Sequence, residues 1–150
     1  MKRVNKSALI PFPAESLYEL VADIESYPQF LSWCSDATII SSKDNVVEAS
    51  ITIAYHGLHK KFTTHNENIP GKSIHMELAD GPFHYLDGIW NFQALDETSC
   101  KVMLDIGFKI SNPVMRLALG GVFEKISNSM VEEFVTRAYQ IFKKTEENEN

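Results

Sequence analysis

Residues 112–141, NPVMRLALGGVFEKISNSMVEEFVTRAYQI, carry the pattern that sets the architecture of this 150-residue chain. Apolar side chains recur there every three or four positions, the spacing that lines one face of an α-helix. They are Met115, Leu119, Val122, Ile126, Met130, Phe134, Ala138 and Ile141. Gly120 and Gly121 cost about 1 kcal/mol each relative to alanine, so we expect a kink or a close approach by another backbone there. The pattern predicts a long C-terminal helix with one apolar face.

The rest of the chain alternates mainly with a period of two, which is typical of β-strands. Val4–Ile10 is predicted as a first strand, and Ala14–Glu25 as an amphipathic helix that begins near Pro13. After a short helix, six strands are expected, and five of them are placed by alternation, over 47–55, 58–68, 74–78, 86–94 and 100–110. The alternation over 58–68 is weaker, with polar residues on both faces. This pattern favours antiparallel strands with one face against a core.

The octapeptide YPQFLSWC, residues 27–34, joins the first helix to these strands and is rich in large apolar side chains. Pro28 disfavours helix at the preceding residue and leaves only a short turn after it. We therefore expect Phe30, Leu31 and Trp33 to form a lid or wall at one end of the space between the sheet and the C-terminal helix.

These elements predict one domain over residues 1–150, which the length of the chain allows. Hairpins form one curved antiparallel sheet, and the helices cover its apolar face, which is an α+β layer architecture. No apolar run approaches the ~18 residues of a membrane-spanning helix. The N-terminus lacks the apolar region of a secretory signal, so we expect a cytoplasmic protein.

The charge of the chain weighs against broad binding to nucleic acid. Its net charge is −6, whereas sequence-independent binding needs lysine and arginine to neutralise phosphates. Two small basic clusters occur: Lys2, Arg3 and Lys6 near the N-terminus, and Lys60 with Lys61 on a predicted strand. A solvated surface is the expected role of both clusters.

No specific catalytic motif is present, because a glycine-rich phosphate loop, GxSxG and HExxH are all missing from the sequence. Cys34 and Cys100 are expected to be packed free thiols, and no metal-ligand spacing occurs. Most histidines are expected to be exposed or satisfied. His84 and Tyr85 differ, since the predicted loop GPFHYLDG could bring them to the mouth of a pocket. We expect no enzymatic activity and no metal.

A surplus of large apolar side chains is expected between the sheet and the long helix. Those concerned are Trp33, Phe83, Trp90, Phe92, Phe108, Met115, Phe123, Met130 and Phe134. Ordinary core packing explains any single one of them. A curved sheet around one helix often leaves space unfilled, however, and a largely apolar pocket with a few polar groups is typical of ligand sites. Both explanations stay open.

Three motifs in order resemble the coenzyme Q-binding and ribosome association toxin (RatA) family, within the START/polyketide cyclase-like superfamily. ESYPQFLSWC is similar to a family segment close to YPxFLPWC, with Ser32 in place of the usual proline. GPFHYLDGIWNF resembles G-P-F-x-x-L-x-G-x-W-x-F. The C-terminal helix resembles V-F-x-x-[IV] followed by M-V-x-x-F-x-x-R-A. The resemblance covers essentially the whole chain and implies a START-like helix-grip fold with an apolar tunnel between sheet and helix.

The resemblance assigns ligand-binding positions to three parts of this tunnel. The lid provides Phe30, Leu31 and Trp33, beside Tyr27 and Pro28; the sheet provides Phe83, Leu86, Trp90 and Phe92, with Tyr85 at the mouth; and the helix provides Val122, Phe123, Ile126, Met130 and Phe134. Arg137 matches the helix arginine of the family, for which an ion pair with Glu133 and a surface contact are both open. No covalent cofactor is implied.

The resemblance also implies functions. The first is non-enzymatic binding of ubiquinone or a related isoprenoid lipid in support of respiration, with transient contact at the inner membrane. The alternative is a bacterial toxin with two partners, an antitoxin and the large ribosomal subunit, whose association with the small subunit it blocks. A cyclase-type enzyme is a third hypothesis, because related folds host that chemistry.

Overall fold

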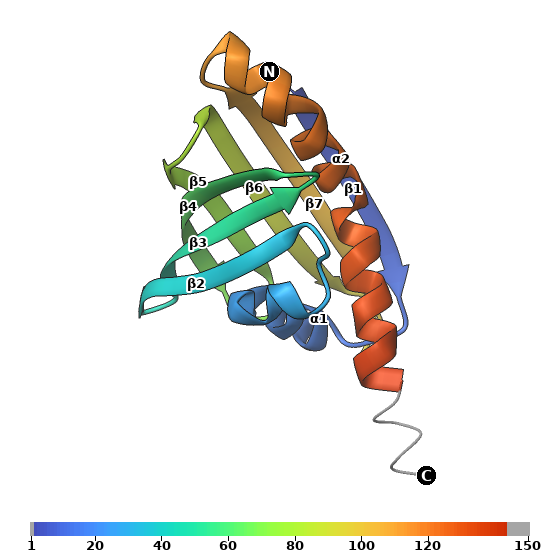
Figure 1. Ribbon diagram of the computed structural model, residues 1–150. Helices are drawn as coiled ribbons and strands as arrows, with labels where there is room; N and C mark the ends of the chain where they lie inside the picture. Colours follow the sequence, from blue (N-terminus) through green and yellow to red (C-terminus); the bar gives the residue numbers. More distant parts are fainter. Residues whose placement is uncertain (1, 144–150) are drawn as a thin grey trace.

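A computed structural model describes residues 2–143 and arranges them around a seven-stranded antiparallel sheet (Figure 1). The order of strands across the sheet is β1-β7-β6-β5-β4-β3-β2. Their bounds are β1 Lys2–Ile10, β2 Cys34–Lys43, β3 Val46–Tyr55, β4 Leu58–Ile69, β5 Ser73–Asp80, β6 Phe83–Ala94 and β7 Cys100–Ile110. The expected curved antiparallel sheet is confirmed.

Helices follow the first and the last strand. They are α1 (Ala14–Ala22) and the 3₁₀ helix η1 (Ile24–Gln29) after β1, and α2 (Pro113–Ala138) with the π-helix η2 (Tyr139–Lys143) after β7. Figure 1 shows α2 running alongside β1 and β7, against which it packs. The sheet thus curves around one long helix, which confirms the helix-grip fold.

The start of α2 is specified locally. The Asn112 side chain accepts a hydrogen bond of 2.8 Å from the backbone N–H of Met115, and Pro113 occupies the first turn, where it gives up no helical hydrogen bond. Gly120 and Gly121 do not interrupt the helix. Among residues 2–143, no atom outside the neighbouring backbone of the helix lies within 4 Å of a Cβ built on Gly121, so close approach of another segment does not explain this glycine. Figure 1 shows the helix changing direction after its first turns, as a kink would.

The segment GPFHYLDG is not the loop that the turn-forming residues predicted. β6 already begins at Phe83, which pairs with Ile110 of β7, and continues without a break through the predicted strand. A register shift between Phe83 and Tyr85 leaves His84 outside the pairing. Pairing with the long neighbouring strand therefore overrides the local turn preference of this segment.

The lid segment is more helical than Pro28 predicts. Both Tyr27 and Pro28 lie within η1, so helix at the residue before proline is tolerated here. The carbonyl of Tyr27 accepts hydrogen bonds from the N–H groups of Phe30 and Leu31. These bonds need no donor from the proline, and the tight 3₁₀ geometry accommodates its ring over a single short element.

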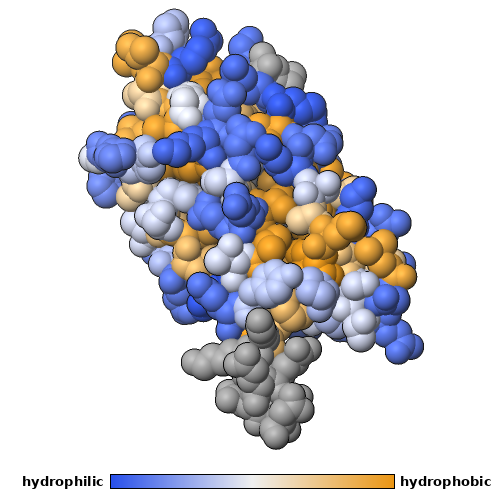
Figure 2. Space-filling view, turned by 90° about the vertical axis from the view of Figure 1, so that its right-hand side faces the viewer, coloured by the Kyte–Doolittle hydropathy of each residue, from blue (hydrophilic) through white to orange (hydrophobic). Residues whose placement is uncertain are grey.

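The side of the molecule that carries α2 and β1 shows both hydrophilic and apolar areas (Figure 2). Apolar atoms gather in its lower half and also at its upper end, the end at which α2 begins. Val114 and Leu117, in the first turns of this helix, are 78% and 90% exposed. Among the described residues, the helices lack the length and apolar character that crossing a membrane requires.

Candidate functional site

A small cavity of about 50 Å³ lies between the sheet and α2. Its lining residues come from η1, the segment after it, five strands and α2: Ile24, Tyr27, Trp33, Ile51, Phe62, Thr64, Asn66, Met76, Leu86, Gly88, Ile106, Phe123, Ile126 and Met130. Small-molecule sites measure about 300–1,000 Å³. In this conformation the cavity has room for a few waters at most, so a larger ligand requires it to widen.

Two polar residues of β4 face this apolar space. The period of two along the strand places Phe62, Thr64 and Asn66 on the inner face of the sheet. Asn66 is 3% exposed, and its Oδ1 has no hydrogen-bond partner among the described residues. Burial of an unpaired amide oxygen costs about 1–3 kcal/mol. Its position suits the recognition of a hydrogen-bond donor inside the cavity.

Asn66 is not among the candidates that the sequence indicates. The available signal was the weak alternation over residues 58–68, where polar residues occupy both faces of a predicted strand. That pattern predicts an exposed strand as readily as a polar group in a core. Only pairing with β3 and β5, which brings Asn66 opposite Val47 and Met76, identifies the buried face.

The predicted ligand-binding residues separate into distinct locations. Those that line the cavity are Trp33, Leu86, Phe123, Ile126 and Met130. Those buried in the core without lining it are Leu31, Phe83, Trp90, Phe92 and Phe134. Phe30 and Val122 are only partly buried, and Tyr85 lies outside the cavity. Contact of any of them with a ligand stays a prediction.

The core residues beside the cavity form a packed aromatic cluster. Phe134 of α2 contacts Tyr27, Phe30 and Trp90, with ring centroids 5.2–5.3 Å apart in edge-to-face geometry. Trp90 also lies parallel to Phe92 at 6.1 Å. Such aromatic pairs add about 0.5–1.5 kcal/mol beyond the burial of their area. This part of the interior is therefore filled by the protein itself.

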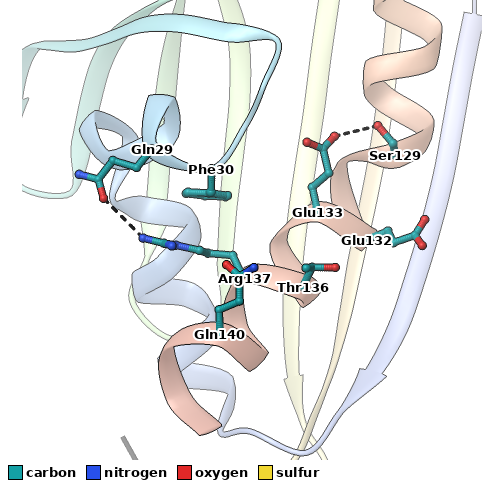
Figure 3. Close-up of a pocket in the computed structure, with 8 residues that line it drawn as sticks. All are labelled: Gln29, Phe30, Ser129, Glu132, Glu133, Thr136, Arg137 and Gln140. Atoms are coloured by element: carbon teal, nitrogen blue, oxygen red, sulfur yellow. Dashed lines mark hydrogen bonds between the residues drawn. The ribbon is translucent and has the colours of Figure 1, made fainter. Parts of the chain in front are cut away.

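Side-chain contacts fasten the lid segment to α2. Trp33 Nε1 donates a hydrogen bond of 3.3 Å to Glu133 Oε1, which also accepts one of 2.8 Å from Ser129 Oγ. Figure 3 shows Glu133 turned toward Ser129. The Trp33 bond is long for a charge-assisted hydrogen bond, so it holds the lid only weakly. An outer groove of about 410 Å³ runs over this junction.

Arg137 makes a surface contact with the lid. Its guanidinium lies 5.2 Å from the centre of the Phe30 ring and donates a hydrogen bond of 3.4 Å to Gln29 Oε1 (Figure 3). Within residues 2–143 it forms no ion pair with Glu133, which answers the question that the sequence left open. The Arg137 Nε is buried without a partner among these residues. One end of α2 therefore holds the lid through stacking and a weak hydrogen bond.

Two titratable groups near the cavity stay protonated at neutral pH. Burial raises the pKa of the Tyr27 hydroxyl, which donates a hydrogen bond to the carbonyl of Val21. Burial also raises the pKa of the Cys34 thiol to about 11. A protonated thiol is a poor nucleophile, so Cys34 has no activation in this environment.

His84 and Tyr85 lie on the outer surface, not at the mouth of the cavity. A groove there is lined by His75, Glu77, Leu78, His84, Tyr85, Leu86 and Asp87. His75 Nε2 is 2.7 Å from Asp87 Oδ1, and these two residues with Glu77 could hold a metal ion. The three side chains are 39%, 32% and 60% exposed, which is common on solvated sheet faces, and no ion is assigned to them.

Residues 10–135 match the protein family described as polyketide cyclase / dehydrase and lipid transport. The chain is 41% identical over 139 residues to the ribosome association toxin RatA of Pseudomonas aeruginosa, covering 93% of this chain and 96% of that protein. It is 22% identical over 146 residues to the mitochondrial coenzyme Q-binding protein COQ10 homolog B of Xenopus laevis, covering 95% of this chain and 60% of that protein.

The fold also has solved counterparts. The Zhui aromatase/cyclase from Streptomyces sp. R1128 superposes with a TM-score of 0.81 at 16% identity, covering 93% of this chain and 94% of that chain. At that identity the likeness establishes the fold alone. The sequence matches go further, because one spans most of the chain and another nearly all of it. This chain therefore belongs to the polyketide cyclase / dehydrase and lipid transport family, in the branch that includes the RatA proteins.

Proposed function

We propose that this protein binds the ribosome, hinders the association of the ribosomal subunits and performs no catalysis. The observation that carries the proposal is the similarity to a ribosome association toxin over 93% of this chain, which includes its surface as well as its core. Binding to a particle of that size uses an outer surface and requires no cavity. The proposal places the protein in the cytoplasm, where ribosomes are.

The test is co-sedimentation with purified large and small ribosomal subunits in a sucrose gradient. We expect the protein to sediment with the large subunit and to lower the fraction of joined particles when both subunits are present. A protein that stays at the top of the gradient with either subunit, at low as well as moderate salt, would overturn the proposal.

A second candidate function is binding of an amphiphilic small molecule, such as ubiquinone or another isoprenoid lipid. The observation that favours it is Asn66 Oδ1, an acceptor without a partner among the described residues, in an otherwise largely apolar cavity. A hydroxyl on the ligand, as in the reduced quinol form of ubiquinone or in a prenol, would donate to this oxygen, whereas the carbonyls of the oxidised quinone only accept. An apolar tail would contribute roughly 25 cal/mol per Å² of buried surface. The lid contacts through Trp33 and Arg137 are weak enough to open and widen the cavity.

Organic extraction of the protein from its native host, followed by mass spectrometry, tests this second function. A stoichiometric isoprenoid that is lost from an Asn66→Leu variant would support it, and an empty extract from the unaltered protein would contradict it. The two functions use different parts of the molecule and do not exclude one another.

An antitoxin partner and a membrane contact stay predictions from the family resemblance. The cyclase hypothesis has support from fold alone.

A further inference from the structure

Acidic residues are unevenly spread along this chain. The net charge is −6, yet no aspartate or glutamate occurs between Glu48 and Glu67. The same stretch contains the adjacent lysines Lys60 and Lys61. An acid-free segment with neighbouring lysines gives a negatively charged protein one local site at which a polyanion meets little repulsion.

This segment forms the β3–β4 hairpin, whose strands pair in continuous register from Val46–Glu67 to Tyr55–Leu58. His56 (φ 47°) and Gly57 (φ 84°) join the strands, both with left-handed backbone conformation. Two such residues form the tight turn that matches the twist of a hairpin. The turn is therefore short and leaves His56 exposed at its tip.

The C-terminal helix adds a third lysine to the tip. Lys125 Nζ donates a hydrogen bond of 2.9 Å to the Tyr55 hydroxyl and lies 5.5 Å from the centre of its ring. The Tyr55 ring contacts the His56 ring at 4.3 Å between centroids. Figure 1 shows the tip of the hairpin reaching toward α2. Lys60 pairs with the buried Ile53 and Lys61 with Thr52, so the two lysines flank the end of the hairpin on opposite faces of the sheet, with Lys60 on the inner face. We define the hairpin-tip surface, which wraps around this end, as Tyr55, His56, His59, Lys60, Lys61 and Lys125.

The two lysine clusters seen in the sequence differ in how far they are neutralised. Lys2 lies 3.7 Å from Glu124 and Arg3 forms an ion pair with a carboxylate of β7, whereas Lys6 forms none with the described residues. Within the described part of the chain, Lys60 and Lys61 form no ion pair. Their charges are therefore free to meet those of a partner.

Carboxylates on adjacent strands limit the extent of this positive surface. Asp36 of β2 pairs with Thr52 of β3, whose partner on β4 is Lys61. On the other side of β4, Asp80 of β5 pairs with Thr63. Neither aspartate comes within 4.0 Å of a lysine of the hairpin-tip surface. They restrict the positive charge to the tip and to Lys125, so the site suits a narrow strand of phosphates and not a wide polyanionic surface.

We propose that the hairpin-tip surface is where this protein contacts ribosomal RNA, with its three lysines against backbone phosphates. The inference rests on the proposed function, because it names the binding face and the chemical group that this face recognises. Lysine–phosphate contacts position a protein on RNA and weaken as salt increases. The Tyr55–His56 ring pair adds an aromatic surface against which an unpaired base can stack.

The test compares two double variants with the same change in charge. Lys60→Glu/Lys61→Glu alters the hairpin-tip surface, and Lys2→Glu/Lys6→Glu alters the N-terminal cluster, each taking the net charge from −6 to −10. Lys2, Lys6 and Lys61 are exposed and Lys60 is half-buried, and thermal unfolding would verify that both variants fold. Affinity is measured by co-sedimentation with purified large subunits over a range of salt concentrations, and by binding to a short labelled RNA hairpin.

We expect the hairpin-tip variant to bind about ten-fold more weakly or worse. The slope of log K against log salt should become shallower by about one for each phosphate that the variant no longer neutralises. The N-terminal variant should bind less than about two-fold more weakly at the same salt concentration.

Equal weakening in both variants, or weakening only in the N-terminal variant, would overturn the inference. If the unaltered protein fails to bind subunits, the proposed function fails. The RNA hairpin then decides the inference: loss of binding only in the hairpin-tip variant supports it, and any other result overturns it.

Discussion

The interior beneath α2 has two parts, one filled and one partly empty, although the same face of the same helix covers both. In the filled part, Phe134 packs edge-to-face against Trp90 and two rings of the lid region. In the other part, a cavity of about 50 Å³ remains, although aromatic rings also line it beside Met130, Gly88 and Asn66. A glycine without a side chain and a polar amide leave space that the neighbouring rings do not fill. A surplus of large apolar residues therefore indicates a strong core more directly than it indicates a ligand site.

The largest expected effect comes from truncation in the filled part. Phe134 is 1% exposed, so Phe134→Ala should lower the free energy of unfolding by about 3–5 kcal/mol. Met130, four residues earlier on α2, is partly buried and borders existing space. Met130→Ala should cost only about 1–2 kcal/mol, because it removes less buried apolar surface. Urea unfolding of both variants measures the difference.

Phe134→Leu is the control for this pair, since it keeps an apolar side chain and should destabilise less than Phe134→Ala. Equal destabilisation at positions 130 and 134 would mean that the two parts of the interior are packed alike. The contrast between a filled and a partly empty core would then be wrong.

A smaller effect, of opposite sign, is expected at Asn66. Asn66→Leu removes an unpaired buried amide oxygen and adds apolar volume next to the cavity, so it should stabilise the protein by about 1 kcal/mol. Thr64→Ser, on the same face of β4, retains a hydroxyl and serves as the control because it fills no space. Thermal unfolding of ligand-free protein would reveal the gain. A clear decrease in the stability of Asn66→Leu would show that the amide is satisfied after all.

The smallest effect is expected at the junction between the lid and α2. Arg137→Ala removes a cation–π contact with Phe30 that is worth about 0.5–1 kcal/mol at an exposed site. Hydrogen exchange of amides in residues 27–33 should become faster, whereas exchange in the β-strands should not change. Arg116→Ala, an exposed arginine near the start of the same helix, is the matched control. Unaltered exchange in the lid would show that Arg137 does not hold it.

The fold was predictable to the extent that its signals are local. Apolar residues at helical spacing, such as Leu119, Ile126 and Phe134 about two turns apart, predict α2, and Asn112-Pro113 marks its start. Gly57 marks the turn of the β3–β4 hairpin. The errors arose where pairing between distant segments outweighed local preference. Residues 83–85 joined β6 despite their turn-forming sequence, because β7 offered a partner along its whole length.

The candidate site was less predictable, because its properties depend on distances between segments that are far apart in the chain. Trp33 and Glu133 are 100 positions apart, and Lys125 and Tyr55 are 70 positions apart. No spacing rule links such pairs. Tyr85 is a different case, because it lies five positions before Trp90 and the period of two along β6 therefore places it on the outer face once the strand is known to include residue 85.

The sequence by itself determined the order of helices and strands, the positions of the main turns and the family of the chain. These follow from periodicity and turn chemistry, which depend on the sterics of neighbouring residues. Only the tertiary structure decided which aromatic residues fill the core, that the Asn66 oxygen is buried without a partner among the described residues, and that the lysines of the β3–β4 hairpin form no ion pair with them. Cavity volume, hydrogen-bond satisfaction and charge pairing all depend on packing between elements, which no local pattern specifies.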